Sequence, residues 1–217
     1  MEVAHAIWEE IEGIKKSIAE HGIRTQSHGR VASLPQIMRL RERVEIYLYN
    51  AKSALRDLAG VLKPIFGTEF TEARYDKILE WSEKTLGNDA ALSQLLRNDQ
   101  TWIKQVVSMR NAVEHPGGYS GHLNVNNFEF ADIKEGQPPI LVEPTWHLNN
   151  DTPTAIVPDL RTLLSNMLNF TEEFVLVSLN QLGINKAAMI VEIPEEKRRK
   201  ECPVRFEVRP NPSFFKT

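Results

Sequence analysis

The stretch "LSQLLRNDQTWIKQVVSMRNAVEHPGG", residues 92–118, predicts a long amphipathic helix that stops at a Pro-Gly-Gly sequence. At about 100° per residue, its apolar positions fall on one stripe of the helix surface: Leu92, Leu95, Leu96, Ile103, Val106 and Val113. Arg110 is expected in the middle of this stripe. Because a guanidinium cannot lose its charge, Arg110 must be paired, hydrogen-bonded or facing a cleft that a ligand or a second subunit completes.

Arg110, Asn111 and His115 are the polar residues that stand out at the end of this helix. Asn111 and His115 are four residues apart, so their side chains share a flank and are able to interact. Arg110 and His115 are about 140° apart around the helix and roughly 7.5 Å along it, so a site using both is better assembled from two copies. The alternative is a capped helix end, because a terminal histidine interacts favourably with the helix dipole, but it leaves Arg110 unexplained.

Apolar positions recur at three- and four-residue steps over most of the first 115 residues, which predicts helices. The expected helices cover residues 2–21, a segment from an N-cap at Ser33 with Pro35 in its first turn to a stop at Pro64, a segment from about Thr71, residues 89–115, and a last helix that Pro158 opens and Gly183 ends. A loop is expected over residues 25–33, between the first two helices.

Two β-favouring runs, "HLNVNNFEFADI" and "PPILVEPTWHL", flank a turn with glycine and predict a hairpin over about residues 123–148. The tail offers two short strands, "AAMIVEI" and "VRFEV", joined by the charge run "PEEKRRKE", which we interpret as a solvated loop. The predicted fold is therefore mainly α: an up-and-down helical bundle over residues 1–185 with an inserted β-hairpin, and a small C-terminal β extension, residues 186–217, packed on it.

Length, charge and cysteine usage narrow the class of protein. The chain has 217 residues, a formal net charge of −3 and one cysteine, Cys202, which excludes an internal disulfide. The N-terminus does not have the pattern of a signal peptide, and no run approaches the roughly 18 apolar residues of a membrane span, so a soluble cytoplasmic protein without membrane partners is expected. Any basic surface must be local, and its best candidates for RNA backbone contacts are Arg39, Arg41 and Arg43, although solvation is the usual role of such a face.

The segment "RNAVEH", residues 110–115, resembles the R-x4-6-H signature of the HEPN superfamily (higher eukaryotes and prokaryotes nucleotide-binding). Arginine is followed directly by asparagine, and histidine closes the final turn of a long helix. Members of that family are α-helical up-and-down bundles, usually dimeric, and many are metal-independent endoribonucleases in toxin, abortive-infection or antiviral systems. The resemblance would cover residues 1 to about 183, while the hairpin and the β tail have no counterpart in it.

The resemblance implies cleavage of RNA by its own 2′-hydroxyl, leaving 2′,3′-cyclic phosphate and 5′-hydroxyl ends without a metal or cofactor. His115 would act as general acid or base, because the charge of imidazole changes near neutral pH. Arg110 would stabilise the phosphate charge, and Asn111 would orient the histidine or hold a phosphate oxygen. In a homodimer with the active site at the two-fold interface, two copies of each residue supply both an acid and a base.

Three further residues are supporting candidates. Glu114 is expected either to pair with Arg110 or to be a simple surface residue. His122, beside the hairpin with His147, would approach the same cleft, and no metal is expected there because a clustered carboxylate or thiolate is missing. In some toxin members a partner nucleotidyltransferase modifies a tyrosine two residues after the histidine, whereas Tyr119 here stands four residues after it.

Two other functions stay open on the sequence. Members of the same superfamily also serve as noncatalytic nucleotide-binding or scaffold modules, and "RNAVEH" is also compatible with a capped terminus in a helical protein-interaction domain. Retention of arginine, asparagine and histidine together favours catalysis, because a scaffold needs no histidine there. A toxin role would add an antitoxin as a candidate partner.

Overall fold

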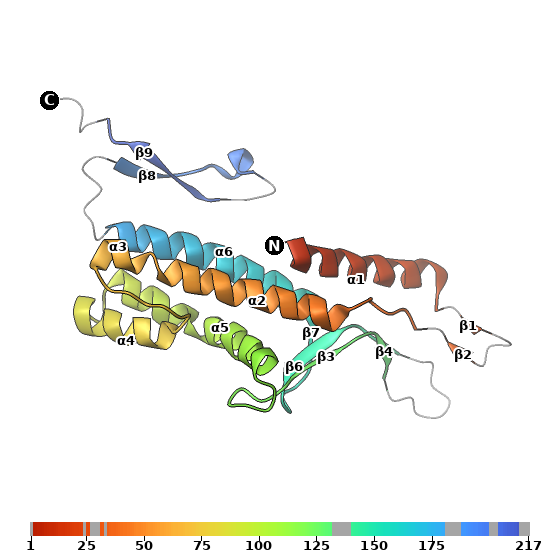
Figure 1. Cartoon of the computed structure of the whole chain (residues 1–217). Coiled ribbons are helices and arrows are strands. Elements are labelled where there is room, and N and C mark those ends of the chain that lie inside the picture. The colour runs from red at the N-terminus through yellow and green to blue at the C-terminus, as the bar shows by residue number, and fades with distance from the viewer. Residues whose placement is uncertain are drawn as a thin grey trace. The chain divides into compact units, whose positions relative to one another are not determined.

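Helices carry most of the chain in the computed structural model, which describes residues 2–23, 25–26, 31–32, 34–131, 140–180, 188–199 and 204–212 (Figure 1). The helices are α1 (Glu2–His21), α2 (Leu40–Ala59), α3 (Leu62–Phe66), α4 (Tyr75–Leu86), α5 (Ala91–Glu114) and α6 (Ile156–Asn180). The chain forms two compact units, unit 1 from Met1–Ala51 and Val106–Leu164 and unit 2 from Lys52–Gln105 and Ser165–Thr217. The mainly α class with small antiparallel sheets is thus confirmed.

In unit 1, α1 buries a narrow stripe at the spacing that the sequence predicts. Ala4, Ile7 and Ile11 are buried, three and four residues apart, as one face of a helix requires. Polar and aromatic contacts hold α1 in place along its length. The guanidinium of Arg161 lies 3.8 Å from the centre of the Trp8 ring, and Arg43 pairs with Glu10. Trp8 is therefore a partly buried contact residue rather than a core residue.

The predicted hairpin is confirmed. Strand β3 (Leu123–Asn126) pairs antiparallel with β6 (Thr145–Leu148), and β4 (Glu129–Phe130) pairs with β5 (Leu141–Val142). The predicted turn "KEGQP" lies outside the described residues. A further strand that the sequence does not predict, β7 (Thr154–Ala155), adds to β6.

Polar side chains attach this hairpin to the helical segments around it. Trp146 on β6 is buried and donates from Nε1 to Asp159 Oδ2 at 2.5 Å, and Thr154 Oγ1 donates to the same oxygen at 2.6 Å. At the other end, Ile37 N–H donates to Asn127 Oδ1 at 3.0 Å and Asn127 Nδ2 donates to the Ile37 carbonyl at 2.9 Å. These bonds therefore fix the position of the hairpin against the first turn of α6 and against the segment before α2.

In unit 2, the core is an aromatic cluster. Tyr75 packs edge-on against Phe170 and Phe174, and Trp102 packs edge-on against Phe170, with ring centres 5.5–6.1 Å apart. The Tyr75 hydroxyl donates to the Leu55 carbonyl at 2.8 Å, and burial raises the pKa of this phenol. Trp102 is buried in this cluster.

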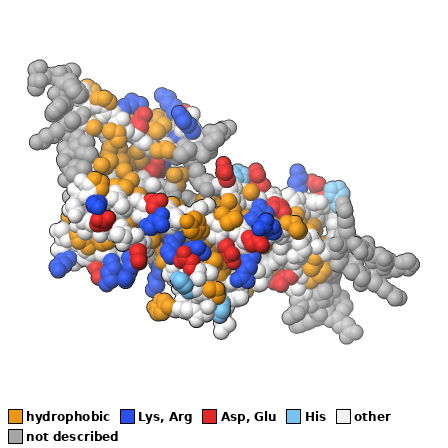
Figure 2. Space-filling view, in the orientation of Figure 1, with side chains coloured by type: hydrophobic (Ala, Val, Ile, Leu, Met, Phe, Trp, Pro, Cys, Tyr) orange, Lys and Arg blue, Asp and Glu red, His pale blue; other side chains and the backbone are white. Residues whose placement is uncertain are grey.

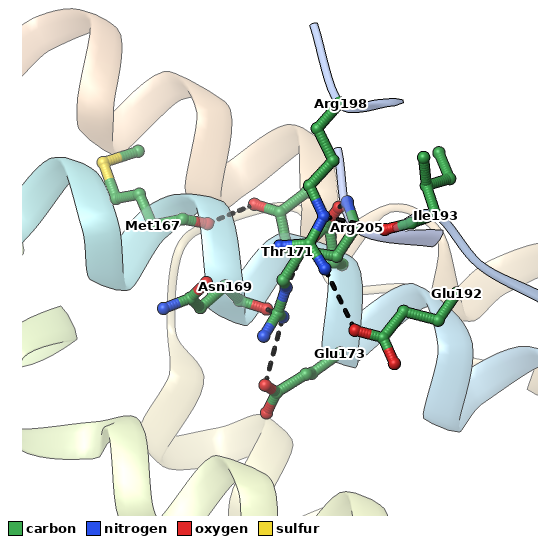
Figure 3. A network of polar contacts seen from close by, with 9 residues as sticks. Met167, Asn169, Thr171, Glu173, Glu192, Ile193, Arg198 and Arg205 are labelled. Atoms are coloured by element: carbon green, nitrogen blue, oxygen red, sulfur yellow. Dashed lines mark hydrogen bonds and ion pairs between the residues drawn. The ribbon is translucent and has the colours of Figure 1, made fainter. Parts of the chain in front are cut away.

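The two predicted C-terminal strands are also confirmed, as β8 (Ala188–Glu192) and β9 (Phe206–Pro210), paired antiparallel. Arg205, just before β9, ties them to α6 (Figure 3). Its Nε donates to Glu172 Oε2 at 2.5 Å, and its Nη2 lies 3.2 Å from Glu173 Oε1 and 3.3 Å from the Asn169 carbonyl. Residues 195–197 form a short 3₁₀ helix within the charge run.

Several predicted boundaries are wrong. Helix α2 begins at Leu40 and not near Ser33, which lies outside the described residues, because the Asn127 amide occupies the backbone groups of Ile37 that a helix would need. Pro64 lies inside α3 instead of ending a helix, since a proline is tolerated in a first turn. The following helix begins at Tyr75, later than predicted. The expected loop over residues 25–33 contains the paired strands β1 (Thr25–Gln26) and β2 (Val31–Ala32).

We expect Asp159→Ala to lower the free energy of unfolding by about 2–4 kcal/mol, because it removes the shared acceptor of Trp146 and Thr154 and leaves a buried indole N–H unpaired. Urea denaturation followed by circular dichroism measures the change. Asp151→Ala, at an exposed position with the same change of charge, should stay within about 0.5 kcal/mol of wild type. Equal effects of the two substitutions would contradict the role assigned to Asp159.

The contribution of Asp99 to the stability of the fold is expected to depend on pH. Its pKa is raised above the ordinary 3.8, first by partial burial and then by the nearby charge of Glu173, while the Trp102 N–H donated to it lowers the pKa. The folded chain therefore binds the Asp99 proton more tightly than the unfolded chain, and this stabilising contribution is lost as the pH rises through the folded pKa.

Asp99→Asn is accordingly expected to raise the Tm at neutral pH and to lose that advantage below pH 3.8. Thermal unfolding across this pH range measures the difference. Asp89→Asn, at an exposed position with the same change of charge, is the control. A lower Tm for Asp99→Asn at neutral pH would show that the Trp102 hydrogen bond to the carboxylate outweighs the cost of burying its charge.

Candidate functional site

The buried stripe of α5 differs from the predicted one in its last two turns. Leu92, Leu95, Leu96, Ile103 and Val106 are buried as predicted, but so are Met109 and Ala112, while Val113 is only partly buried. The stripe therefore passes through Met109, which lies about 100° from its neighbour Arg110. Arg110 is on the flank of the stripe and not in its middle, and this position lets its long side chain reach the helix surface.

The Arg110 side chain is 14% exposed and has an incomplete set of partners. Its Nη2 lies 3.1 Å from Glu114 Oε1, so of the two interpretations of Glu114 the ion pair is the one observed. The Arg110 Cζ is 5.2 Å from the centre of the Tyr49 ring on α2, within the range of a cation–π contact. The Nε–H of Arg110 is buried without a hydrogen-bond partner among the described residues.

An open depression of about 310 Å³ lies beside this guanidinium. It is lined by Glu42, Glu45, Ile46, Tyr49 and Arg110. Ile46 and Tyr49 are 49% and 54% exposed, so this part of α2 presents apolar and aromatic surface beside Arg110. The depression thus joins one cation, two carboxylates and an open aromatic face.

His115 lies just past the end of α5 and is exposed. Its backbone N–H donates to the Asn111 carbonyl at 2.9 Å, which continues the helical pattern by one residue. Asn111 is partly buried on the same turn. His115 is not among the residues that line the Arg110 depression, so this single chain does not bring Arg110 and His115 into that one pocket.

The loop after α5 is closed by backbone hydrogen bonds. The Gly118 N–H donates to the His115 carbonyl, the Gly121 N–H to the Gly118 carbonyl and the Gly117 N–H to the Gly121 carbonyl, each at 2.9 Å. Gly117 and Gly121 have φ values of 78° and 76°, a conformation that favours glycine. The loop is therefore a compact, internally satisfied turn.

Asn149, which follows β6, fixes this loop from the other side. Its Oδ1 accepts the His122 N–H at 2.9 Å, its Nδ2 lies 3.4 Å from the Ser120 carbonyl, and its own N–H donates to the His122 carbonyl at 2.8 Å. His122 lies against Gly117, since a Cβ at Gly117 would be 3.3 Å from His122 Nε2. Tyr119 occupies the tip of the loop and is fully exposed.

The predicted basic face at the start of α2 is balanced by carboxylates. Arg39 pairs with Glu42, Arg41 pairs with Glu45 at 3.1 Å, and Arg43 pairs with Glu10. Figure 2 shows the same mixture on one face of the molecule, where Lys and Arg side chains are interspersed with Asp and Glu. The three arginines therefore offer less attraction for a phosphate backbone than their positive charges suggest.

The comparisons with protein-family models, with curated proteins and with solved structures find no match for this chain. The resemblance carried by "RNAVEH" therefore remains a prediction. Within the described part of the chain, no cluster of three His, Cys, Asp or Glu residues is arranged to hold a metal ion. No helix in the same part is long and apolar enough for a membrane span.

Sequence reasoning missed two residues of this region, Tyr49 and Asn149. Tyr49 has a signal in the sequence, because it is an aromatic residue on the polar face of an amphipathic helix, next to the apolar Leu48. Asn149 opens an Asn-Asn-Asp turn after a strand, which predicts a turn but not its contact with a loop 27 residues away.

Gly121→Ala should destabilise the protein by at least about 1–2 kcal/mol, because a left-handed alanine is strained. A Cβ there would also lie 1.8 Å from Asn149 Oδ1. Gly13→Ala is the matched control, since Gly13 lies within α1 with nothing within 4 Å of an added Cβ, and it should stabilise by about 0.5–1 kcal/mol. Urea denaturation of both variants gives the signs. A neutral Gly121→Ala would show that the loop is not held as described.

Proposed function

We propose that the protein is a metal-independent endoribonuclease of the HEPN type, an up-and-down helical bundle that works as a cytoplasmic homodimer in toxin–antitoxin or antiviral defence. The observation that carries this proposal is the state of Arg110. Its guanidinium is mostly buried, has a buried Nε–H without a partner among the described residues, and borders an open depression. Leaving such a donor unpaired costs about 1–3 kcal/mol, and a guanidinium is a strong partner for the oxygens of a phosphate.

The contacts of Arg110 suit a phosphate-binding role. Glu114 holds Nη2 from the next turn of the same helix and the Tyr49 ring supports the guanidinium, so the side chain is already oriented before a ligand arrives. A permanent positive charge fixed in this way stabilises the extra negative charge of a pentacoordinate phosphate without reorganising during the reaction. Arg110 would therefore be the electrostatic catalyst.

In the proposed reaction, the 2′-oxygen of one ribose attacks the adjacent phosphorus while a general base accepts the 2′-hydroxyl proton. The bond from phosphorus to the 5′-oxygen of the next nucleotide breaks, and a general acid protonates that oxygen. The products are a 2′,3′-cyclic phosphate and a 5′-hydroxyl, and no redox change or metal is needed. The exposed imidazole of His115 suits the base or acid role, with Asn111 one turn before it.

A second copy of the chain would complete this site. His115 does not line the Arg110 depression, and a two-fold axis at the end of α5 would supply two copies of each residue. Ile46 and Tyr49, both about half exposed beside Arg110, offer apolar surface for that contact. The defence role and an antitoxin partner follow from the family resemblance alone.

A noncatalytic nucleotide-binding module of the same fold is the second candidate. The observation that favours it is the composition of the Arg110 depression, where Tyr49 offers a ring for a base and Arg110 a donor for a phosphate, while His115 is not part of it. Glu42 and Glu45 in the same depression would repel additional phosphates. This candidate predicts binding of a nucleotide without cleavage of RNA.

We expect the purified full-length protein to cleave a labelled single-stranded RNA in the presence of EDTA, and His115→Ala and Arg110→Ala each to reduce the rate by roughly 10²- to 10⁴-fold. The new 5′ ends should accept phosphate from polynucleotide kinase without prior dephosphorylation. A 2′-deoxy substitution at the cleaved position should block the reaction. Light scattering should give the mass of a dimer.

Two substitutions serve as matched controls. His21→Ala removes a histidine from the last turn of α1, and Arg97→Ala removes an exposed, paired arginine from α5 itself, so both should leave cleavage unchanged. Nucleotide binding without cleavage would favour the second candidate. If the folded protein neither binds a nucleotide nor cleaves RNA, the result would favour the third interpretation, in which "RNAVEH" is only the capped end of a helix in a protein-interaction domain.

A further inference from the structure

Tyr119 presents an aromatic ring that contributes nothing to the core. Its relative exposure is 109%, the highest among the exposed large hydrophobic residues of the described chain, so both faces of its ring are open. Neighbouring side chains do not cover it, and burying a ring of this size would release about 25 cal/mol for each Å² of apolar surface covered. The ring is thus available as a contact surface.

The loop fixes the backbone from which this ring projects. Tyr119 and Ser120 are the two corner residues of the turn closed by the Gly121 N–H and the Gly118 carbonyl. The bonds of Asn149 to Ser120 and His122 anchor the residues after the ring, and the Gly118 bond to His115 anchors those before it. A backbone that is ordered before binding costs little further entropy when a ligand covers the side chain that it carries.

Two histidines lie close to the backbone from which the ring projects. A Cβ at Gly118 would lie 3.3 Å from His115 Cβ, and a Cβ at Gly117 would lie 3.3 Å from His122 Nε2, so one histidine borders each glycine of the pair just before Tyr119. Larger side chains at these two positions would crowd the histidines. Glycine at these two positions therefore leaves room for both histidines beside the backbone that leads to Tyr119.

The surroundings of Tyr119 fit a nucleobase better than a protein surface. Within residues 102–131, all of which are described, no other large apolar side chain is exposed. A protein partner usually covers an apolar core of several residues, whereas a base of single-stranded RNA needs one open aromatic face. An imidazole N–H nearby can donate a hydrogen bond to a phosphate oxygen of the same nucleotide.

We propose that Tyr119 is a base-binding platform: an unpaired base of single-stranded RNA stacks on its ring while a phosphate next to that base lies at His115. The inference rests on the proposed function, to which it adds a subsite and a substrate class. It makes the enzyme selective for unpaired RNA, because a base within a duplex is already stacked and does not reach the ring.

The test measures how tightly a fluorescent single-stranded RNA binds to the full-length His115→Ala protein, in which cleavage is blocked. Adding Tyr119→Ala should raise the Kd by roughly 5- to 150-fold, the usual effect of losing one base–aromatic stack. Tyr119→Phe and Tyr119→Trp should keep a Kd close to that of the parent, because they preserve an aromatic face. Val208→Ala, at a 61% exposed position on β9, is the control and should have no effect.

An abasic scan of the RNA identifies the stacked base. Removing the base at one position should weaken binding to the parent protein and should have no further effect in Tyr119→Ala. Unchanged binding by Tyr119→Ala, in a protein that binds RNA and whose wild type cleaves it through His115, would overturn this inference alone and would assign the ring to a protein partner. A parent protein that neither binds nor cleaves RNA would overturn the proposed function and this inference together.

Discussion

The charge of Arg110 is the constraint on which the candidate site depends. A guanidinium stays ionised, so its placement on the flank of a buried stripe requires compensation by neighbours. Glu114 and the Tyr49 ring supply part of that compensation, and a buried Nε–H is left over. Unpaired buried donors are uncommon in folded proteins, and this one belongs to a cation that lines an open depression, which is the observation behind the proposed phosphate contact.

Arg205 shows what an arginine with a purely structural role looks like in the same chain. Its side chain bonds to Glu172, Glu173 and the Asn169 carbonyl, and its backbone N–H also donates to Glu172. The hydrogen bond that Arg205 donates to Glu172 is the largest of the effects that raise the pKa of Arg205, ahead of the opposing effect of burial. The bonds of Arg205 join β8 and β9 to α6. Arg110 has the same chemistry with one partner missing.

The inserted hairpin supports the loop that follows α5. Asp159 fixes Trp146 of β6, β6 leads directly to Asn149, and Asn149 holds the backbone of Ser120 and His122. Residues that are distant in the sequence thereby determine where Tyr119 stands and how the end of α5 is closed. The hairpin has no counterpart in the family that "RNAVEH" resembles, and its position beside that motif gives it a part in the site.

The sequence alone determined the elements whose signals are local. The 3.6-residue period of α1 and α5, the alternating runs of the hairpin and the two tail strands all lie where the patterns place them, because each depends on neighbours in the chain. The Glu114 pair is local too, four residues from Arg110 on one helix, but the sequence allowed both this pair and a simple surface residue, and the structure shows the pair. Only the tertiary structure decided the late start of α2, which the amide of Asn127 imposes on Ile37, and the shift of Arg110 from the middle of its stripe to the flank. It also decided the contact of Asn149 with the loop and of Tyr49 with Arg110, since both join segments far apart in the sequence, and no periodicity within one segment encodes such a contact.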